Sequence, residues 1–260
     1  MPVLEQILAR LDAGYDFSGW HWQSNTPPEY VCISAVLVQH TNWRNVERAL
    51  ERLREAGVVS LDAVLRLPED ELAELIRPAG TPVPKARRLR ALAQLAAEHG
   101  GLDGLLALPT RELRARLLAT YGIGPETADA IVLYAAGRPV FQVDAYTVRL
   151  FRRLGLGPEK DRYESWQRWF EEALCAPSPR PAAGGEGAGD VETYRRYHGL
   201  IVLHGKQTCR PKPLCEGCCL LAICDMGREI VAGRASARQR SGARQAEACP
   251  TGWNGGGSSC

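Results

Sequence analysis

The sequence predicts an all-α protein, because almost every stretch with a regular apolar pattern has the helical period. Many of these stretches end near a glycine, which commonly stops a helix. They are residues 3–11, 45–57, 85–100, 111–122, 126–137 and 145–155. The best candidate strand, PVFQV at 139–143, is short and stands between helical patterns, so it does not change the predicted class.

The chain of 260 residues is long enough for one large or two modest domains. It is 45% hydrophobic and 24% charged, as is usual for a soluble protein, and it has no apolar run that would form a signal peptide or a membrane span. We therefore expect a cytoplasmic protein, close to the nucleoid in a bacterium, without a membrane partner. We expect 176–190, which is rich in Pro, Gly and Ala, to form an exposed loop. We expect 228–260, which has few large apolar residues, to be a disordered tail.

Net charge gives no indication of a nucleic-acid partner. The total is +2, and residues 228–260 supply +3 of it through five arginines and two glutamates, so the rest carries −1. Any DNA-binding surface must come from local clustering of basic residues. One such group is Lys85 with Arg87 and Arg88 at a predicted helix start; a solvated helix face is the alternative.

Five of the nine cysteines lie within sixteen residues, in the pattern Cys209-x5-Cys215-x2-Cys218-x5-Cys224 with Cys219 as the fifth. Zinc sites usually pair two C-x2-C units over a longer separation, whereas four closely spaced thiolates suit a [4Fe–4S] cluster. Structural zinc and unliganded cysteines remain alternatives, and Cys219 could replace Cys218. Arg210 and Lys212 in this loop could meet phosphates or simply be solvated.

Gly122-Ile123-Gly124 predicts a tight turn between two helices, with Pro125 at the first helical position. The free N–H groups of such a helix start can bind one DNA phosphate without regard to sequence. A purely structural turn is the alternative. Asp144 follows Gly124 by twenty residues, after an apolar segment, and it could also cap the helix at 145–155.

This helix–glycine turn–helix, the later aspartate and the four-cysteine loop together resemble the endonuclease III (HhH-GPD) superfamily of DNA glycosylases, from Val31 to Cys224. The resemblance implies a two-lobed fold that holds DNA and a flipped-out base between the lobes. Residues 30–138 would form a six-helix barrel lobe with the hairpin, and 1–29 with 139–227 would form the cluster lobe. It implies a monomer acting on double-stranded DNA that contains a damaged base. The first cysteine gap is five residues here instead of the usual six.

The resemblance also implies the chemistry. Asp144 matches the catalytic aspartate, and Glu126 stands where strand-cutting members carry a lysine that forms a Schiff base. A carboxylate cannot form that imine. We therefore expect a monofunctional glycosylase with Asp144 and Glu126 as its candidate catalytic residues. The alternatives are a bifunctional glycosylase/lyase on oxidised pyrimidines, using another amine, and a non-catalytic DNA-binding protein with a structural metal.

Residues 34–50 resemble the branch of the superfamily that includes the bacterial 3-methyladenine glycosylases. In that branch two aromatic rings sandwich the excised base, and by position Trp22 and Trp43 are the candidates, with Trp20 nearby. Core packing is the alternative for these tryptophans. Gln39 matches the residue that fills the hole left by the flipped base, and His198 is expected to be a packing or capping residue. An alkylated purine is the favoured substrate, ahead of an oxidised pyrimidine.

Overall fold

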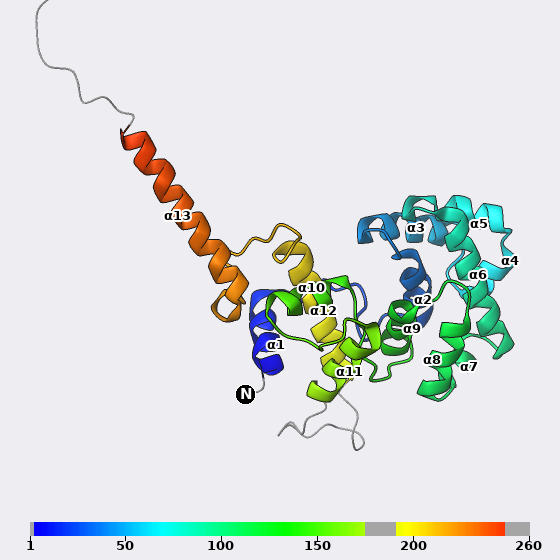
Figure 1. Cartoon of the computed structure of the whole chain (residues 1–260). Helices are drawn as coiled ribbons and strands as arrows, with labels where there is room; N and C mark the ends of the chain where they lie inside the picture. The colour runs from blue at the N-terminus through cyan, green and yellow to red at the C-terminus, as the bar shows by residue number, and fades with distance from the viewer. Residues whose placement is uncertain (1–2, 175–190, 248–260) are drawn as a thin grey trace, which may run out of the picture.

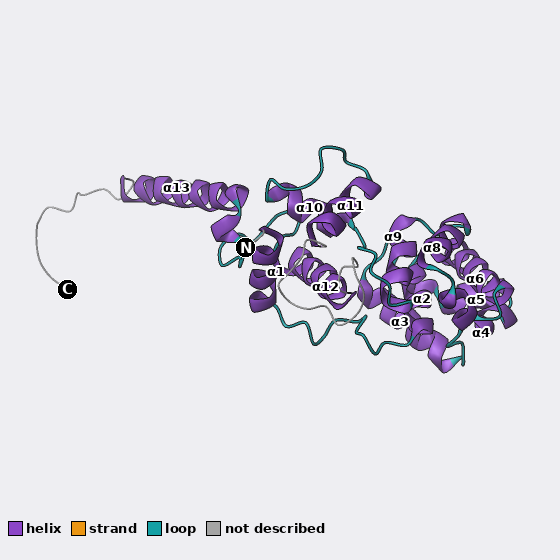
Figure 2. Ribbon diagram, turned by 90° about the horizontal axis from the view of Figure 1, so that it is seen from below, coloured by secondary structure: helices purple, strands orange, loops and turns teal. Residues whose placement is uncertain are grey.

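The computed structural model describes residues 3–174 and 191–247, and all the regular structure in these ranges is helical (Figures 1 and 2). The predicted all-α class is confirmed. Residues 139–143 have no regular secondary structure and pair with no strand in the described chain. Side chains satisfy their backbone instead: Phe141 N–H donates to Glu171 Oε1 at 2.9 Å, and Gln167 Nε2 donates to Phe141 O at 2.9 Å.

One group of helices gathers around α2 and α6 (Figure 1). α2 is buried on every side, since all residues from Val31 to Leu37 are inaccessible. α6 packs against α4, α5 and α7, while α2 packs against α3, α6, α9 and η2. The elements are α2 (Pro28–Leu37), α3 (Trp43–Glu55), α4 (Leu61–Arg66), α5 (Glu69–Leu75), η1 (Arg77–Ala79), α6 (Pro82–Glu98), α7 (Leu102–Ala107), α8 (Thr110–Ala119), α9 (Pro125–Ala130) and η2 (Ile131–Ala135).

A second group combines the start of the chain with later helices. α12 packs against both α1 and α10, and its contact with η2 joins the two groups. Its elements are α1 (Val3–Gly14), α10 (Ala145–Arg153), α11 (Tyr163–Leu174), α12 (Val191–Gln207) and η3 (Leu221–Ile223). The division into 30–138 and 1–29 with 139–227 is kept as a proposed pair of lobe boundaries.

The first part of the tail predicted from residue 228 is helical in the structure. α13 (Asp225–Glu247) runs through it and projects away from the second group (Figure 1). A scarcity of large apolar residues predicts disorder, but alanine, arginine, glutamine and glutamate favour a helix without needing burial. Residues 248–260, and the predicted loop at 176–190, lie outside the described residues. None of the helices in the described part of the chain is both long and apolar enough to span a membrane.

α9 continues into a π-helical turn, η2, in which Ala136 N–H donates to Ile131 O at 3.0 Å. Single π-turns inside helices often occur at functional sites. The wider turn carries Tyr134, whose hydroxyl is 2.7 Å from His198 Nδ1 on α12. The hairpin helix is thereby connected to the second group at the place where the candidate site lies.

Candidate active site

The turn between α8 and α9 needs its first glycine for two reasons. Gly122 has φ +75°, and a Cβ there would lie 2.3 Å from Arg88 Cγ. Gly124 is the N-cap of α9, and the amides of Gly124 and Glu126 have no acceptor within the described residues. These two donors are available to an anion.

The predicted DNA contact of Ile123 is contradicted. Its side chain is buried and its N–H donates to Thr120 O at 3.1 Å. Ile123 therefore anchors the turn in the core, and the exposed backbone of Gly122 and Gly124 remains as the candidate contact.

Gln39 lies against this turn. Its Nε2 donates to Gly122 O at 3.2 Å and to Thr127 Oγ1 at 2.9 Å, and its Oε1 accepts from Arg88 Nη1 at 2.5 Å. In the free protein Gln39 thus holds the hairpin to the end of α2. It would have to exchange these partners to reach into DNA.

Lys85 is not a phosphate ligand, contrary to the prediction. It is 1% exposed, and its Nζ donates to Leu37 O and Ala79 O, both at 2.8 Å. Burial, followed by the charge of Arg88, lowers the pKa of Lys85 to about 8. The run of basic residues at the start of α6 predicted a side chain that faces solvent. The sequence does not reveal that carbonyls at the ends of α2 and η1 converge on Lys85.

Asp144 is the N-cap of α10. Its Oδ1 accepts from Thr147 N–H at 2.7 Å and from Thr147 Oγ1 at 2.8 Å, so the predicted capping role is present. Its side chain is 8% exposed, and its Oδ2 lies 3.6 Å from His198 Nε2. Burial alone would raise the pKa of Asp144, but the His198 contact and the Thr147 hydrogen bonds outweigh burial and lower it. Asp144 is held as a carboxylate.

His198 is more than the packing residue that the sequence suggested. It is buried, its Nδ1 is paired with the Tyr134 hydroxyl, and its Nε2 faces Asp144 without another partner among the described residues. Tyr134 therefore orients a ring whose other nitrogen faces the carboxylate.

Glu126 shows the opposite electrostatic behaviour. Partial burial and then the negative charge of Asp144 raise the pKa of Glu126 to about 7, although its side chain still reaches solvent. Lys206 on α12 is a third ionisable group here: burial lowers its pKa, which Asp144 and Glu47 partly restore. Two carboxyl groups with pKa values pushed apart, near an amine, are typical of an acid–base site.

An aromatic cluster borders these groups, and it consists of Trp20, His21, Trp22, Trp43, Tyr134 and His198. The three predicted tryptophans are therefore brought together. However, the rings of Trp22 and Trp43 meet edge-on, at 6.0 Å and 87°, and Trp22 is fixed by a 2.9 Å hydrogen bond to Ser34 Oγ. In this arrangement these two rings cannot flank a flat base from both sides.

The ring that lies parallel to Trp43 is His21, which the sequence analysis missed. Their centroids are 3.4 Å apart with an interplanar angle of 20°, and Trp20 contacts His21 at 4.0 Å. Burial, together with the charge of Lys206, lowers the pKa of His21 to about 2, so the imidazole is neutral. A base between His21 and Trp43 would need about twice the present spacing, and the stack must open to admit it. Only the position of His21 between two tryptophans signalled this in the sequence.

The cysteine loop follows α12. Cys209, Cys215, Cys218 and Cys224 line one small pocket, whereas Cys219 does not line it and lies close to Gly14 of α1. Arg153 Nη1 donates to Cys209 Sγ at 3.3 Å, and Gly227 N–H donates to Cys224 Sγ at 3.3 Å. Within the described residues, no three or more His, Cys, Asp or Glu side chains converge as the ligands of a single metal ion. Arg210 and Lys212 are exposed on this loop, which is compatible both with phosphate contacts and with simple solvation.

Comparisons with known proteins agree with this geometry. Residues 33–175, more than half of the chain, match the family of HhH-GPD superfamily base excision DNA repair proteins. The chain is 40% identical over 213 residues to a protein of Methanocaldococcus jannaschii provisionally named a DNA repair glycosylase, covering 81% of this chain and 90% of that one. It is 30% identical over 223 residues to endonuclease III of Thermotoga maritima, covering 83% and 90%.

Two solved structures show the same fold. The H. pylori 3-methyladenine DNA glycosylase MagIII, bound to 1,N6-ethenoadenine, has a TM-score of 0.65 at 28% identity, covering 80% of this chain and 98% of that one. A non-covalent endonuclease III–DNA complex has a TM-score of 0.70 at 22% identity, covering 89% and 100%. With its hairpin, its buried carboxylate and these relatives, the chain belongs to the HhH-GPD superfamily of base excision DNA repair proteins and is a DNA glycosylase.

Proposed function

We propose that this glycosylase is monofunctional: it flips a damaged base out of double-stranded DNA, hydrolyses the N-glycosidic bond and leaves the abasic strand whole. The observation that carries the proposal is the pair of unlike carboxyl groups. The pKa of Asp144 is lowered by His198 and Thr147 against burial, and the pKa of Glu126 is raised to about 7. No lysine occupies position 126 to form an imine with the sugar.

Each carboxyl group then has a separate task. The C1′–N bond breaks with its electron pair leaving on the base, and the ionised Asp144 stabilises the oxocarbenium-like sugar. An alkylated cation leaves as a neutral base, whereas an uncharged base takes a proton from protonated Glu126 as it departs. In both cases a water molecule forms the new C1′–O bond while its proton passes to a carboxylate of the pair. His198, oriented by Tyr134, keeps Asp144 in place and ionised.

The hairpin supplies the phosphate contact in this proposal. The free amides of Gly124 and Glu126 would bind one DNA phosphate, and Arg210 and Lys212 would approach the backbone from the cysteine loop. Gln39 would leave Gly122 and Thr127 to occupy the space of the flipped base. Flipping itself costs a few kcal/mol and costs least at damaged or mismatched pairs.

The aromatic cluster supports an alkylated purine as the substrate. Neutral, electron-rich rings attract a cationic base through cation–π contact and stacking. In the proposed bound state the base stacks on Trp43 after His21 moves away from it, with Trp20 and Trp22 around it. MagIII, the H. pylori relative, is a 3-methyladenine glycosylase, which favours this class over oxidised pyrimidines.

We also propose that the cysteine loop holds a [4Fe–4S] cluster. The fit rests on the donor set: four thiols line one pocket, and four closely spaced cysteines suit the larger cluster. Cys209, Cys215, Cys218 and Cys224 would be the ligands, with the hydrogen bonds from Arg153 and Gly227 to two of the sulfurs. The bound cluster would cross-link the loop and so fix Arg210 and Lys212.

Lys206 supports a second candidate, a bifunctional glycosylase/lyase. It is the amine that interacts with Asp144, and burial lowers its pKa, which favours the neutral nucleophile. In that case Lys206 instead of a residue at position 126 would attack C1′.

One set of assays tests these proposals. Duplexes that each contain one defined lesion are incubated with the protein, and alkali then reveals abasic sites. We expect excision of alkylated purines with no strand cleavage before alkali, and a loss of about 10²–10⁴-fold in Asp144→Asn. Borohydride should trap no covalent adduct. A trapped adduct that disappears in Lys206→Met would establish the bifunctional alternative, and full activity of Asp144→Asn would refute the mechanism.

A further inference from the structure

We propose that one exposed side of α3, formed by Arg44, Arg48 and Arg52 and called here the α3 arginine face, binds successive phosphates of one strand beside the lesion. The proposal rests on the proposed function, because the duplex is the same one that delivers the damaged base. It adds a binding surface outside the hairpin, the carboxyl pair and the cysteine loop.

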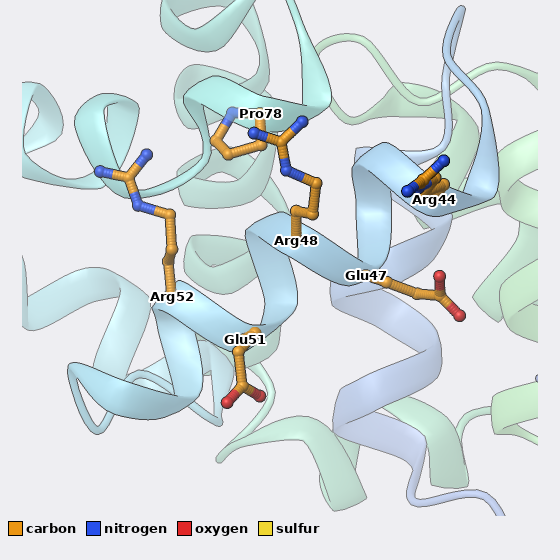
Figure 3. A pocket seen from close by; sticks show the side chains of 6 residues that line it. All are labelled: Arg44, Glu47, Arg48, Glu51, Arg52 and Pro78. Atoms are coloured by element: carbon orange, nitrogen blue, oxygen red, sulfur yellow. The ribbon is translucent and has the colours of Figure 1, made fainter.

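The helical spacing places these three side chains on the same side. Residues four apart lie one above the other at a rise of about 6 Å, so the face extends over about 12 Å. In Figure 3 Arg48 and Arg52 extend from α3 toward Pro78 of η1, while Glu47 and Glu51 point to the other side of the helix. A shallow hollow beside α3 is lined by the three arginines together with Glu47, Glu51 and Pro78.

The face carries positive charge that the protein does not neutralise. Among the described residues, Arg44 and Arg48 have no ion-pair partner within 4.0 Å. Arg52 has one, the exposed Glu74, at the long distance of 3.6 Å. Within the described residues, neither neighbouring acid forms an ion pair with Arg44 or Arg48. Glu51 pairs with Arg54 at 2.6 Å.

Glu47, the other acid near the face, forms no ion pair within 4.0 Å among the described residues, so its carboxylate does not occupy Arg44 or Arg48. The two unpaired guanidinium groups are therefore available to an external anion, and arginine suits phosphate through its forked donors.

The position of the face indicates which anion it meets. α3 begins at Trp43, the ring on which His21 stacks, and Gln39, just before this helix, contacts the hairpin. The face therefore starts at the site and leads away from it along α3. A duplex bound to the hairpin continues past the site, and each of its strands presents one phosphate about every 3.4 Å along the axis. A 12 Å row of cations is complementary to about three such phosphates.

The test is the salt dependence of DNA binding by the full chain. Arg44→Gln/Arg48→Gln removes the two unpaired cations, and glutamine keeps helix propensity. The matched control is Arg66→Gln/Arg111→Gln, which removes two exposed arginines on α4 and α8. Each phosphate contact contributes about 0.9 to the slope of log K against log salt. Between 50 and 200 mM salt, wild type and control should thus lose about tenfold more affinity than the double variant.

Undamaged duplex serves as the probe for this slope, so the result does not depend on excision. A double variant with the slope of the control overturns the proposal, as does tighter binding of an acidic peptide than of DNA. Absence of excision by the wild-type protein would instead refute the proposed function and leave the slope measurement valid.

Discussion

Replacing Glu126 by glutamine tests whether this residue works as an acid. Its pKa of about 7 means that the protonated fraction falls from about 0.9 at pH 6 to about 0.1 at pH 8. If the protonated form donates to the leaving base, kcat/KM for excision should fall nearly tenfold over this interval. Because Asp144 has a lowered pKa, it stays ionised throughout and contributes no inflection there. Protonation of Asp144 should reduce the excision rate only at a pH below the ordinary pKa of an aspartate.

At pH 6, Glu126→Gln should have a kcat/KM about 10²-fold lower, because it has lost the proton donor. Its kcat/KM should not change between pH 6 and 8. Glu112→Gln is the matched control, since Glu112 is an exposed glutamate of α8 paired with Arg116 at 3.4 Å. It should keep the wild-type profile. The assay is the initial rate of abasic-site formation on an uncharged alkylated purine at each pH, with circular dichroism to show that folding is constant. A wild-type rate that rises with pH across 7, or an inflection that persists in Glu126→Gln, would refute the acid role.

Two further substitutions separate binding groups from structural ones. Cys218→Ser should lose bound iron and visible absorbance, whereas Cys219→Ser should keep both, because only Cys218 of the two lines the shared pocket; the reverse result would exchange the ligand assignment. Lys85→Met should lower the free energy of unfolding by about 1–3 kcal/mol, since two buried carbonyls lose their donor, while the salt slope of DNA binding stays at the wild-type value. A reduced slope with unchanged stability would restore the phosphate role that the sequence suggested for Lys85.

The fold class followed from the sequence because helical periodicity is a local signal, and the order of hairpin, aspartate and cysteines identified the superfamily. The helix-capping position of Asp144 was predictable for the same reason, because a cap and the apolar segment before it are both short-range features. Contacts between distant segments could not be predicted. His198 meets Asp144 only because α12 packs on α10, across 54 positions of sequence.

The predictions for Lys85 and His21 differ from the structure for this reason, Lys85 by a role it does not have and His21 by a contact that was not foreseen. Lys85 had the composition of a surface residue but is enclosed by the ends of α2 and η1. His21 had no feature of its own, yet the approach of α3 to the segment before α2 places it on Trp43. In both cases the deciding partner lies more than twenty residues away or on another element, where neither charge pattern nor periodicity carries information.

The position of Glu126 has a physical logic that only the assembled site makes clear. The positive end of α9 should lower the pKa of a glutamate in its first turn, yet burial and Asp144 raise it. A DNA phosphate bound to the amides of Gly124 and Glu126 would cancel the helix contribution, add another negative charge and exclude water. All three effects raise the pKa further, so the turn that binds DNA would also keep Glu126 protonated until the base has left. The pKa of Glu126 in the DNA complex, read from the pH dependence of the single-turnover excision rate, should accordingly exceed the value of about 7 expected from kcat/KM for the free protein.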